Sequence, residues 1–335
     1  MQHIATWWEP ENNKIRCQLC PHYCLLGEGE TGLCRTRQNK QHQLITTVYG
    51  NMAAINTDPI EKKPLYHFLP GSQSLSVATK GCNLRCLNCQ NSFLSQSGPE
   101  TNENGFIEPL HIIETAKNNN IPSLSFTYTE PTVFYEWMID TAQLARKYNI
   151  KTCMVSSGFI NPEPLKKLLP YIDAVNIDLK AFDNNVYRKL CGASLKPVLK
   201  TLELIKDEGV HLEITSLIIP GWNDDSATIQ KMCEWLVARG FSDIPIHFSR
   251  FFPSYKLAHL PPTPESTILE ACRQAHRAGL KYVYAGNMPG SNLDNTICSN
   301  CQSTLITRQG YNVNVTGLNE NRCAKCNTII YGLFK

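Results

Sequence analysis

Hydrophobic and polar positions from residue 73 onward alternate between short apolar runs and longer amphipathic stretches. The short runs predict strands at 75–79, 123–128, 151–156, 173–179, 211–219, 244–250 and 281–285. Between them, apolar residues recur at helical spacing near 107–119, 131–148, 163–169, 195–207, 226–239 and 264–278. Strands and helices that alternate on this spacing predict parallel β/α units with right-handed crossovers.

The number of these units indicates an incomplete barrel. Six or seven of them are too few for a closed eightfold barrel, so the expected fold is α/β, a partial (β/α)6-type TIM barrel. We expect three parts: a cysteine-rich metal-binding segment with a connector over 1–72, the partial barrel over 73–295, and a zinc-ribbon-like or rubredoxin-like tail over 296–335. Within the connector, 46–72, the prolines argue against long regular elements.

Three cysteines follow the first predicted strand with the spacing Cys82-x3-Cys86-x2-Cys89. Three thiolates on one loop can hold three corners of a 4Fe–4S cluster and leave the fourth iron without a protein ligand. Such an iron can chelate the amine and carboxylate of a small molecule, and S-adenosylmethionine offers both. A structural zinc site is the alternative, but it usually needs a second half-site, which this loop lacks. The spacing therefore predicts radical chemistry carried by a cofactor.

The chain has 15 cysteines among its 335 residues, and two further groups have ligand spacing. The first group can close a structural zinc site or fully ligate an auxiliary iron–sulfur cluster, and consists of Cys17, Cys20, Cys24 and Cys34. Zinc is the commoner outcome for four such cysteines. The second group forms paired C-x2-C knuckles that fit zinc or a single iron, and consists of Cys298, Cys301, Cys323 and Cys326. Four scattered cysteines are expected to be packing residues: Cys153, Cys191, Cys233 and Cys272.

Polar residues on the predicted strands mark candidate positions inside the barrel. In the strand that ends at Lys180, apolar and polar residues alternate strictly, so Asn176, Asp178 and Lys180 point to the face away from the covering helices. An acid and a base inside a barrel need a ligand or each other. Both alternatives are open for this pair.

Three other predicted strands contain, or are followed by, polar candidate residues. Thr129 and Glu130 follow the second strand, where Glu130 either accepts a ligand's amino group or is a helix N-terminal acid. Thr215 lies on the fifth strand beside Glu213. His247 lies on the sixth strand, either as a satisfied core histidine or as an active-site group.

Charge and hydropathy exclude several classes of function. The net charge is +3 without a basic block, so we expect no nucleic-acid partner. The first residues lack the basic and apolar regions of a signal peptide, and the chain has no run of about 18 apolar residues that could span a membrane. We expect a cytoplasmic protein without a membrane partner.

Several motifs spread over nearly the full chain carry a family resemblance: Cys17 to Cys24, Asp58 to Gly71, Gly81-Cys82-Asn83, Cys89-Gln90-Asn91, Tyr128-Thr129-Glu130-Pro131 and the tail knuckles. The chain resembles the AmmeMemoRadiSam-system radical S-adenosylmethionine (SAM) enzymes. These are distant relatives of the pyruvate formate-lyase activating enzyme and of the glycyl radical enzyme activating family. Two departures stand out, since Asn88 replaces an aromatic residue before the third cysteine and the second strand lacks the family's glycines.

The resemblance implies an enzyme that cleaves SAM reductively at its 4Fe–4S cluster. The 5′-deoxyadenosyl radical released would abstract hydrogen from a protein or peptide substrate. It also implies a low-potential electron donor and association with Memo-like and AMMECR1-like proteins. Two other readings are open: a maturase that modifies a side chain or metabolite with the help of an auxiliary cluster, and a zinc-ribbon binding module without activity.

The resemblance also implies roles for the barrel's polar residues. Catalytic roles are implied for Asp178, Lys180 and His247. Contacts with the cofactor are implied for Thr129, Glu130, Asn176, Asp178, Thr215 and His247.

Overall fold

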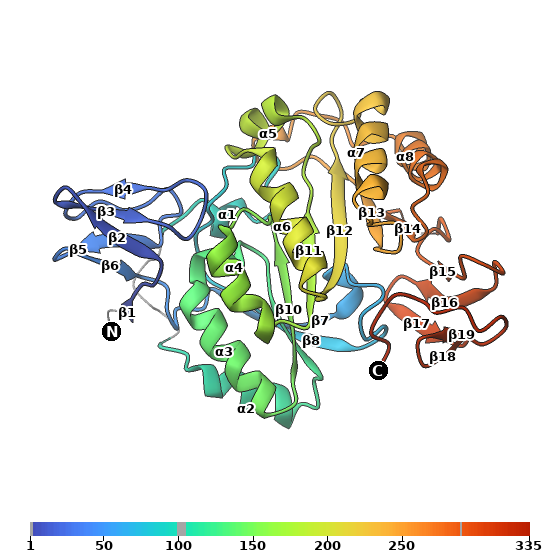
Figure 1. The fold of residues 1–335 in the computed structure, drawn as a ribbon, viewed down its shortest axis with the longest axis horizontal. Helices are drawn as coiled ribbons and strands as arrows, with labels where there is room; N and C mark the ends of the chain where they lie inside the picture. The colour runs from blue at the N-terminus through green and yellow to red at the C-terminus, as the bar shows by residue number, and fades with distance from the viewer. Residues whose placement is uncertain (1–2, 99–104, 289) are drawn as a thin grey trace.

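A computed structural model describes residues 3–98, 105–288 and 290–335. Its centre is an eight-stranded sheet in the order β14-β13-β12-β11-β10-β9-β8-β7 (Figure 1). Strands β8 to β14 are parallel, with the bounds β8 (Gln73–Ala78), β9 (Ser123–Phe126), β10 (Lys151–Ser156), β11 (Ala174–Asp178), β12 (His211–Ile218), β13 (Ile246–Arg250) and β14 (Val283–Gly286). Because β7 and β14 are the two edges, the sheet is an open partial barrel, as the sequence pattern predicts.

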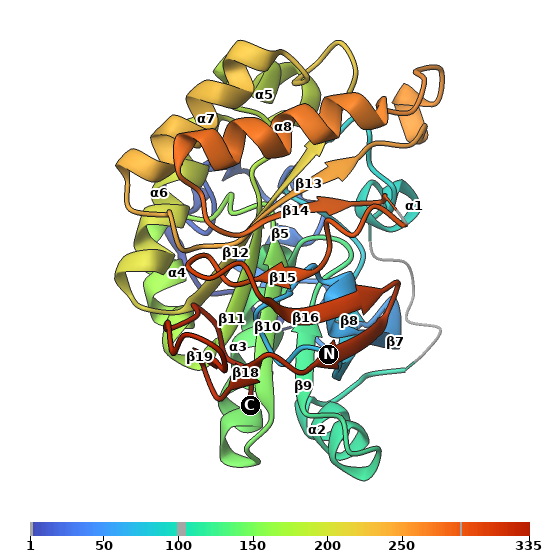
Figure 2. The ribbon, with the colours of Figure 1, turned by 90° about the vertical axis from the view of Figure 1, so that its right-hand side faces the viewer.

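Helices cover the outer face of this sheet, and α7 and α8 cross it side by side (Figure 2). Their bounds are α1 (Ser92–Ser95), α2 (Pro109–Asn118), α3 (Tyr135–Lys147), α4 (Pro162–Leu168), α5 (Asn184–Cys191), α6 (Leu195–Asp207), α7 (Ser226–Ala238) and α8 (Glu265–Ala278), with 3-10 turns η1 (Ile60–Lys62), η2 (Pro131–Phe134), η3 (Leu169–Tyr171) and η4 (Tyr255–Leu257). All six predicted helices are present. Within the described ranges, no helix has both the length and the apolar character needed to cross a membrane.

The connector contains a strand that the sequence pattern did not predict, β7 (Ala54–Pro59). It pairs antiparallel with β8 along its full length. The prolines do not prevent this, because Pro59 is the last residue of an edge strand, where a missing N–H breaks no ladder. The sequence argued only against long elements in the connector, and β7 has six residues.

Small antiparallel sheets flank the barrel on opposite sides (Figure 1). The N-terminal pair contains β1 (His3–Ile4), β5 (Arg37–Lys40) and β6 (Gln43–Thr46) in one sheet, and β2 (Trp8–Glu11), β3 (Lys14–Cys17) and β4 (Leu25–Leu26) in the other. The tail contains β15 (Thr296–Ile297), β16 (Thr304–Gln309) and β17 (Asn312–Val315) in one sheet, and β18 (Leu318–Asn319) and β19 (Arg322–Cys323) in the other.

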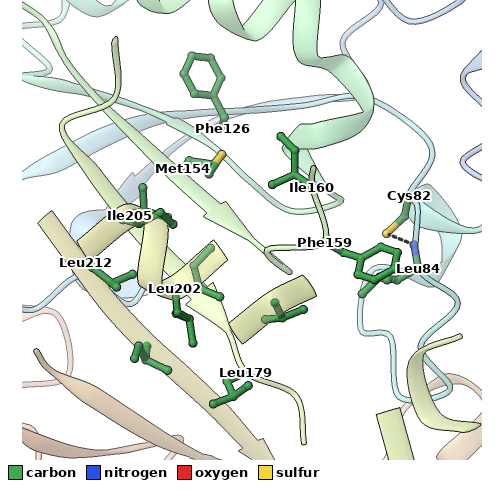
Figure 3. Packing of buried hydrophobic residues seen from close by; sticks show 14 of the residues in the cluster. Cys82, Leu84, Phe126, Met154, Phe159, Ile160, Leu179, Leu202, Ile205 and Leu212 are labelled. Carbon is green, nitrogen blue, oxygen red and sulfur yellow. Dashed lines mark hydrogen bonds between the residues drawn. The ribbon is translucent and has the colours of Figure 1, made fainter. Parts of the chain in front are cut away.

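The hydrophobic core shows how these parts are joined. Ile15 and Leu19 of the N-terminal segment belong to the same buried cluster as the barrel residues, so this segment and the barrel share one core. Cys82, Leu84 and Phe159 also lie in that cluster, which brings the cysteine loop into contact with the barrel interior (Figure 3). The tail has a separate small core, in which Tyr282 and Tyr284 of the barrel meet residues such as Leu305.

A buried ion pair fastens the N-terminal segment to α3. Arg37 Nη2 lies 2.5 Å from Glu136 Oε1, with side-chain exposures of 2% and 4%. The same carboxylate oxygen accepts hydrogen bonds from the main-chain N–H and the hydroxyl of Thr6, both at 2.8 Å. Removing the carboxylate would leave the guanidinium charged and buried without its partner.

We therefore expect Glu136→Ala to lower the free energy of unfolding by about 3 kcal/mol or more, the usual cost of an uncompensated buried charge. Thermal unfolding followed by circular dichroism measures the effect. The matched control is Glu163→Ala, which breaks the exposed Lys166–Glu163 pair at 3.5 Å and should cost less than about 1 kcal/mol. Equal effects of the two substitutions would contradict a structural role for the Arg37–Glu136 pair.

Candidate functional site

The loop with Cys82, Cys86 and Cys89 follows β8 at the carboxyl end of the parallel sheet. In α/β barrels this is the end where the loops gather and chemistry takes place. Main-chain hydrogen bonds hold the loop to the end of α5: Arg85 N donates to Cys191 O at 2.8 Å, and Leu87 N donates to Leu190 O at 2.9 Å.

Other carboxyl-end loops hold the remaining sides of this cysteine loop. Asn83 Nδ2 donates to Phe159 O after β10, at 2.8 Å. The hydroxyl of Ser254, after β13, donates to Asn88 O at 2.8 Å. Segments far apart in the sequence thus position the three thiols.

The three thiols fit a polynuclear cluster. Cys82 and Cys86 are buried and Cys89 is half-buried. Burial raises the pKa of Cys82, and the neighbouring Glu130, Cys86 and Cys89 raise it further, so the three sulfurs are close enough to interact. Among the described residues, however, these sulfurs do not form a group with all spacings within 4.8 Å. Wider spacing suits a cluster, because each thiolate binds a different iron.

Cys191 is a neighbour of this site that the sequence pattern did not reveal. It is fully buried, and its thiol hydrogen-bonds to Cys86. The sequence pattern placed it with the packing cysteines because it belongs to no motif. Only the fold brings the end of α5 beside the loop that follows β8.

Asp178 and Lys180 form an ion pair at the carboxyl end of β11. Lys180 Nζ lies 2.8 Å from Asp178 Oδ2, and the two side chains remain 23% and 35% exposed. Burial alone would lower the pKa of Lys180, but attraction to Asp178 and Cys86 outweighs it and raises the pKa. A partly exposed ion pair next to the cysteine loop can meet a ligand there.

Glu130 is fully occupied by contacts within the protein. One carboxylate oxygen accepts from Thr132 N at 3.2 Å, the Thr132 hydroxyl at 2.8 Å and the Ser156 hydroxyl at 2.7 Å, and the other accepts from Ser157 N at 2.8 Å. Its side chain caps η2, so the structure favours the helix-terminal alternative for Glu130. The neighbouring Thr129 donates from its hydroxyl to Thr79 O at 2.9 Å.

Tyr128, at the end of the second predicted strand, has an unusual conformation. Its φ of 66° lies in the left-handed region, which glycine adopts more easily. Two contacts hold it there, since its hydroxyl donates to Asp58 and its carbonyl accepts from Asn91 Nδ2 at 2.8 Å. The two contacts tie this residue to the connector strand β7 and to Asn91.

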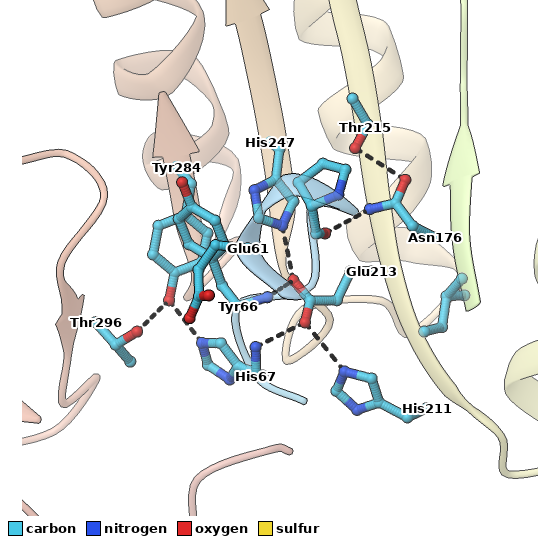
Figure 4. Close-up of polar contacts among 12 residues, drawn as sticks. Glu61, Tyr66, His67, Asn176, His211, Glu213, Thr215, His247, Tyr284 and Thr296 are labelled. Carbon is cyan, nitrogen blue, oxygen red and sulfur yellow. Dashed lines mark hydrogen bonds and ion pairs between the residues drawn. The ribbon is translucent and has the colours of Figure 1, made fainter. Parts of the chain in front are cut away.

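His247 lies in a different region, near the amino end of the sheet. Its Nε2 donates to Glu213 Oε2 at 2.7 Å, and His211 Nε2 donates to Glu213 Oε1 at 3.1 Å (Figure 4). Main-chain N–H groups of Tyr66 and His67 donate to the same carboxylate at 3.0 and 2.7 Å. Burial alone would raise the pKa of Glu213, but the hydrogen bonds from the two histidines lower it below its usual range.

Asn176 and Thr215 are hydrogen-bonded to each other, and Asn176 is also bonded to the connector. Asn176 Nδ2 donates to Pro64 O at 2.8 Å, and the Thr215 hydroxyl donates to Asn176 Oδ1 at 2.9 Å (Figure 4). The connector around Pro64 therefore fills the barrel at the level of these side chains. The structure favours the satisfied-core alternative for His247, whose ring is bonded to Glu213. Thr215 is the register partner of Asp178 on the neighbouring strand, so the network around Glu213 adjoins the Asp178–Lys180 pair.

The tail cysteines form a compact group. The four sulfurs of Cys298, Cys301, Cys323 and Cys326 all lie within 4.8 Å of one another. Two of the spacings are 3.6 Å, between Cys298 and Cys326, and 3.7 Å, between Cys301 and Cys323. A tetrahedral ion with metal–sulfur bonds of about 2.3 Å requires sulfur spacings of about 3.8 Å. The tail therefore fits one mononuclear metal ion.

Comparisons with known proteins agree with the fold and the cysteine loop. Residues 76–236 match the radical SAM superfamily. The uncharacterized protein MJ0808 of Methanocaldococcus jannaschii is 43% identical over 328 residues, 97% of this chain and 98% of that protein. The pyruvate formate-lyase 1-activating enzyme of Escherichia coli K12 is 24% identical over 160 residues, 47% of this chain and 65% of that enzyme.

A solved structure shares the fold. Streptococcus suis SuiB bound to precursor peptide SuiA superposes with a TM-score of 0.52 at 14% identity, over 69% of this chain and 52% of that chain. At this identity the likeness concerns the fold alone.

The chain is thus an enzyme of the radical SAM kind, with homology to activating enzymes. More narrowly, it belongs to one family with the MJ0808 protein of M. jannaschii. The inactive binding-module alternative is thereby set aside.

The buried polar network around Glu213 leads to a prediction about the pH dependence of folding stability. His67 is fully buried, its Nδ1 donates to Tyr331 O at 2.5 Å, and its Nε2 lies 2.6 Å from the Tyr284 hydroxyl. Burial lowers the pKa of His67 to about 4, so the folded protein holds it neutral. An unfolded chain protonates the same histidine below about pH 6.5. Stability from this group is therefore complete above pH 6.5 and is lost as the pH falls toward 4.

We expect the wild-type protein to lose about 2 kcal/mol from this group between pH 7 and 5, and His67→Gln to lose correspondingly less. Denaturant unfolding at the two pH values measures the difference. His111→Gln, in which an exposed histidine of α2 is replaced, is the control and should keep the wild-type pH dependence. An unchanged slope in His67→Gln would contradict the assignment.

Proposed function

We propose that this enzyme holds a 4Fe–4S cluster through Cys82, Cys86 and Cys89 and uses it to cleave SAM for hydrogen abstraction from a protein or peptide substrate. When bound, the cluster supplies the electron that converts SAM into methionine and a 5′-deoxyadenosyl radical. The proposal rests on the position of three cysteines that form no disulfide. They lie on one loop at the carboxyl end of the parallel sheet, beside Asp178 and Lys180.

The residues of this chain contribute position and charge. The cysteine loop is held by main-chain bonds from the ends of other elements, so its thiolates are preorganised before a cluster binds. Lys180 offers an ammonium group and Asp178 a carboxylate, which suit the carboxylate of SAM and a hydroxyl or N–H donor. Thr129, at the end of β9, is the remaining candidate contact from the carboxyl end.

A protein or peptide substrate is supported by the names of the relatives. One is the pyruvate formate-lyase 1-activating enzyme, and another is the (2S)-3-sulfopropanediol dehydratase activating enzyme of Klebsiella oxytoca. The open edge of the sheet supports it as well, because β14 and β7 do not pair and the strands leave the barrel unclosed. Association with Memo-like and AMMECR1-like proteins, a low-potential electron donor and a cytoplasmic location stay predictions from the sequence.

A second candidate is a maturase that modifies a side chain or metabolite. The N-terminal group of four cysteines favours it, because four thiolates can ligate an auxiliary iron–sulfur cluster. Incubation with a candidate glycyl radical protein separates the two functions. A stable radical signal on that protein supports the activating role, whereas a covalently altered product without such a signal supports the maturase.

The central test is release of 5′-deoxyadenosine from SAM under reductant in an oxygen-free preparation. We expect Cys82→Ala/Cys86→Ala/Cys89→Ala to reduce release to background, because no cluster can be held. Cys233→Ala, which replaces a buried cysteine of α7, is the matched control and should retain release. No release from the wild-type protein with several reductants would contradict the proposal.

Cys191→Ala tests whether the cluster has three or four cysteine ligands. We expect the variant to keep its cluster and to release 5′-deoxyadenosine, because the contact of Cys191 with Cys86 is a hydrogen bond between thiols. Loss of the cluster would make Cys191 a fourth ligand and leave no open iron for SAM. Iron content and the change of the cluster's EPR spectrum on addition of SAM measure the outcome.

Asp178→Asn tests the ion pair. Loss of a charged hydrogen bond costs about 1.5–3 kcal/mol, so we expect 5′-deoxyadenosine release to fall at least about tenfold. Iron content should be unchanged. Asp243→Asn, which breaks the exposed Lys281–Asp243 pair, is the control and should leave release near the wild-type rate. A normal rate in Asp178→Asn would remove this residue from the site.

For the tail we propose a single structural metal ion. We assign it as zinc, because four-cysteine sites of this kind usually bind zinc rather than iron. Cys301→Ser/Cys326→Ser should lose one equivalent of zinc and unfold the tail at lower temperature, because such small folds depend on their metal. Cys272→Ala is the control and should keep the zinc. One equivalent of iron with rubredoxin-like absorption would instead make the site mononuclear iron.

A further inference from the structure

The N-terminal cysteines line an enclosed space between the N-terminal sheets and the barrel. Cys17 ends β3, Cys20 follows in a turn, and Cys24 and Cys34 lie in the loops before β4 and β5. All four line one small cavity. Its other walls include Gly32, Arg37 and Asn83.

The spacing of these four thiols differs from that of the tail. All four thiols of this group line one cavity. Yet within the described ranges its sulfurs do not all lie within 4.8 Å of one another, as the tail sulfurs do. A mononuclear zinc ion would draw the sulfurs to spacings of about 3.8 Å and leave no cavity between them.

Arg37 offers a donor to this cavity. The residue is 1% exposed, and its Nε–H has no hydrogen-bond partner although the other two nitrogens are bonded to Thr6 and Glu136. Glu136 Oε2, in the same ion pair, also has no partner. A buried N–H without a partner is costly, and Arg37 lines the cavity, so an acceptor held there would satisfy it. The sulfides of an iron–sulfur cluster are such acceptors, and a bare metal ion is not.

Gly32 leaves space between two of the sulfurs. A Cβ atom there would lie 3.6 Å from Cys34 Sγ and 3.8 Å from Cys24 Sγ. The backbone of Gly32 is outside the left-handed region, so its conformation does not require glycine. Both distances are ordinary van der Waals contacts, so a Cβ atom would fill the space beside the two sulfurs without a clash.

The cavity also adjoins the loop of the SAM-cleaving site. Asn83, between Cys82 and Cys86, lines the cavity, and its carbonyl lies 2.7 Å from His22 Nε2. Gly81, directly before Cys82, packs tightly against the N-terminal segment. A Cβ atom there would lie 2.7 Å from Cys34 O. The two cysteine sites therefore share a wall.

From the cavity, the wide sulfur spacing and the unpartnered guanidinium donor, we infer that Cys17, Cys20, Cys24 and Cys34 bind an iron–sulfur cluster of two or four irons. This resolves the choice between zinc and an auxiliary cluster that the sequence leaves open. Four thiolates saturate such a cluster, so no iron is free to bind SAM or substrate.

The test compares two variants, each purified without oxygen, with the wild-type protein. In Cys82→Ala/Cys86→Ala/Cys89→Ala only the N-terminal site can hold iron. We expect two or four irons with equal sulfide, and a reduced EPR signal that SAM does not change. In Cys20→Ala/Cys34→Ala we expect iron to fall by two or four per chain and zinc to stay constant, while the remaining signal still responds to SAM.

Loss of one zinc and no iron in Cys20→Ala/Cys34→Ala would overturn the inference, and so would unchanged contents of both metals. Cys301→Ser/Cys326→Ser provides the control for zinc, since it empties only the tail. The readouts are independent of the proposed reaction. If the wild-type protein releases no 5′-deoxyadenosine but the first variant carries a cluster, the proposed function fails and this inference stands.

Discussion

One buried carboxylate, that of Glu213, holds the amino end of the barrel together. It accepts two hydrogen bonds from the main chain of the connector and one from each of His211 and His247. A charge in this position must be fully bonded, because burial in a low dielectric is costly. His67 extends the network to the tail through Tyr331. Connector, barrel and tail are therefore interdependent, and space for chemistry remains at the carboxyl end.

The carboxyl end depends on a different kind of interaction. The loop with Cys82, Cys86 and Cys89 is irregular, so its shape is determined by hydrogen bonds to segments that follow β10, α5 and β13. The same loop forms one wall of the N-terminal cavity through Asn83. A substitution in the N-terminal segment can thus disturb the SAM-cleaving site without touching any of its ligands.

Much of the fold could be predicted from local pattern. The strands from β8 to β14 and the helices that follow them have clear periodicity, and the cysteine spacings show directly which residues can act together. Elements outside this pattern were missed, among them β7 and α5. β7 contains polar residues and a proline that only an edge strand tolerates, and α5 is a helix of eight residues, too short to give a clear helical period.

The sequence by itself determined the ligand groups and the alternation of strand and helix, because both depend on residues close together in the chain. Only the tertiary structure decided which inward-facing polar residues meet the cysteine loop. Asn176 and Asp178 lie on the same face of β11, but the connector bonds to the first and leaves the second exposed near Cys86. Period-two alternation gives the face of a strand. It does not show which inward-facing side chains a distant segment covers, and here the connector bonds to Asn176 while Asp178 stays partly exposed.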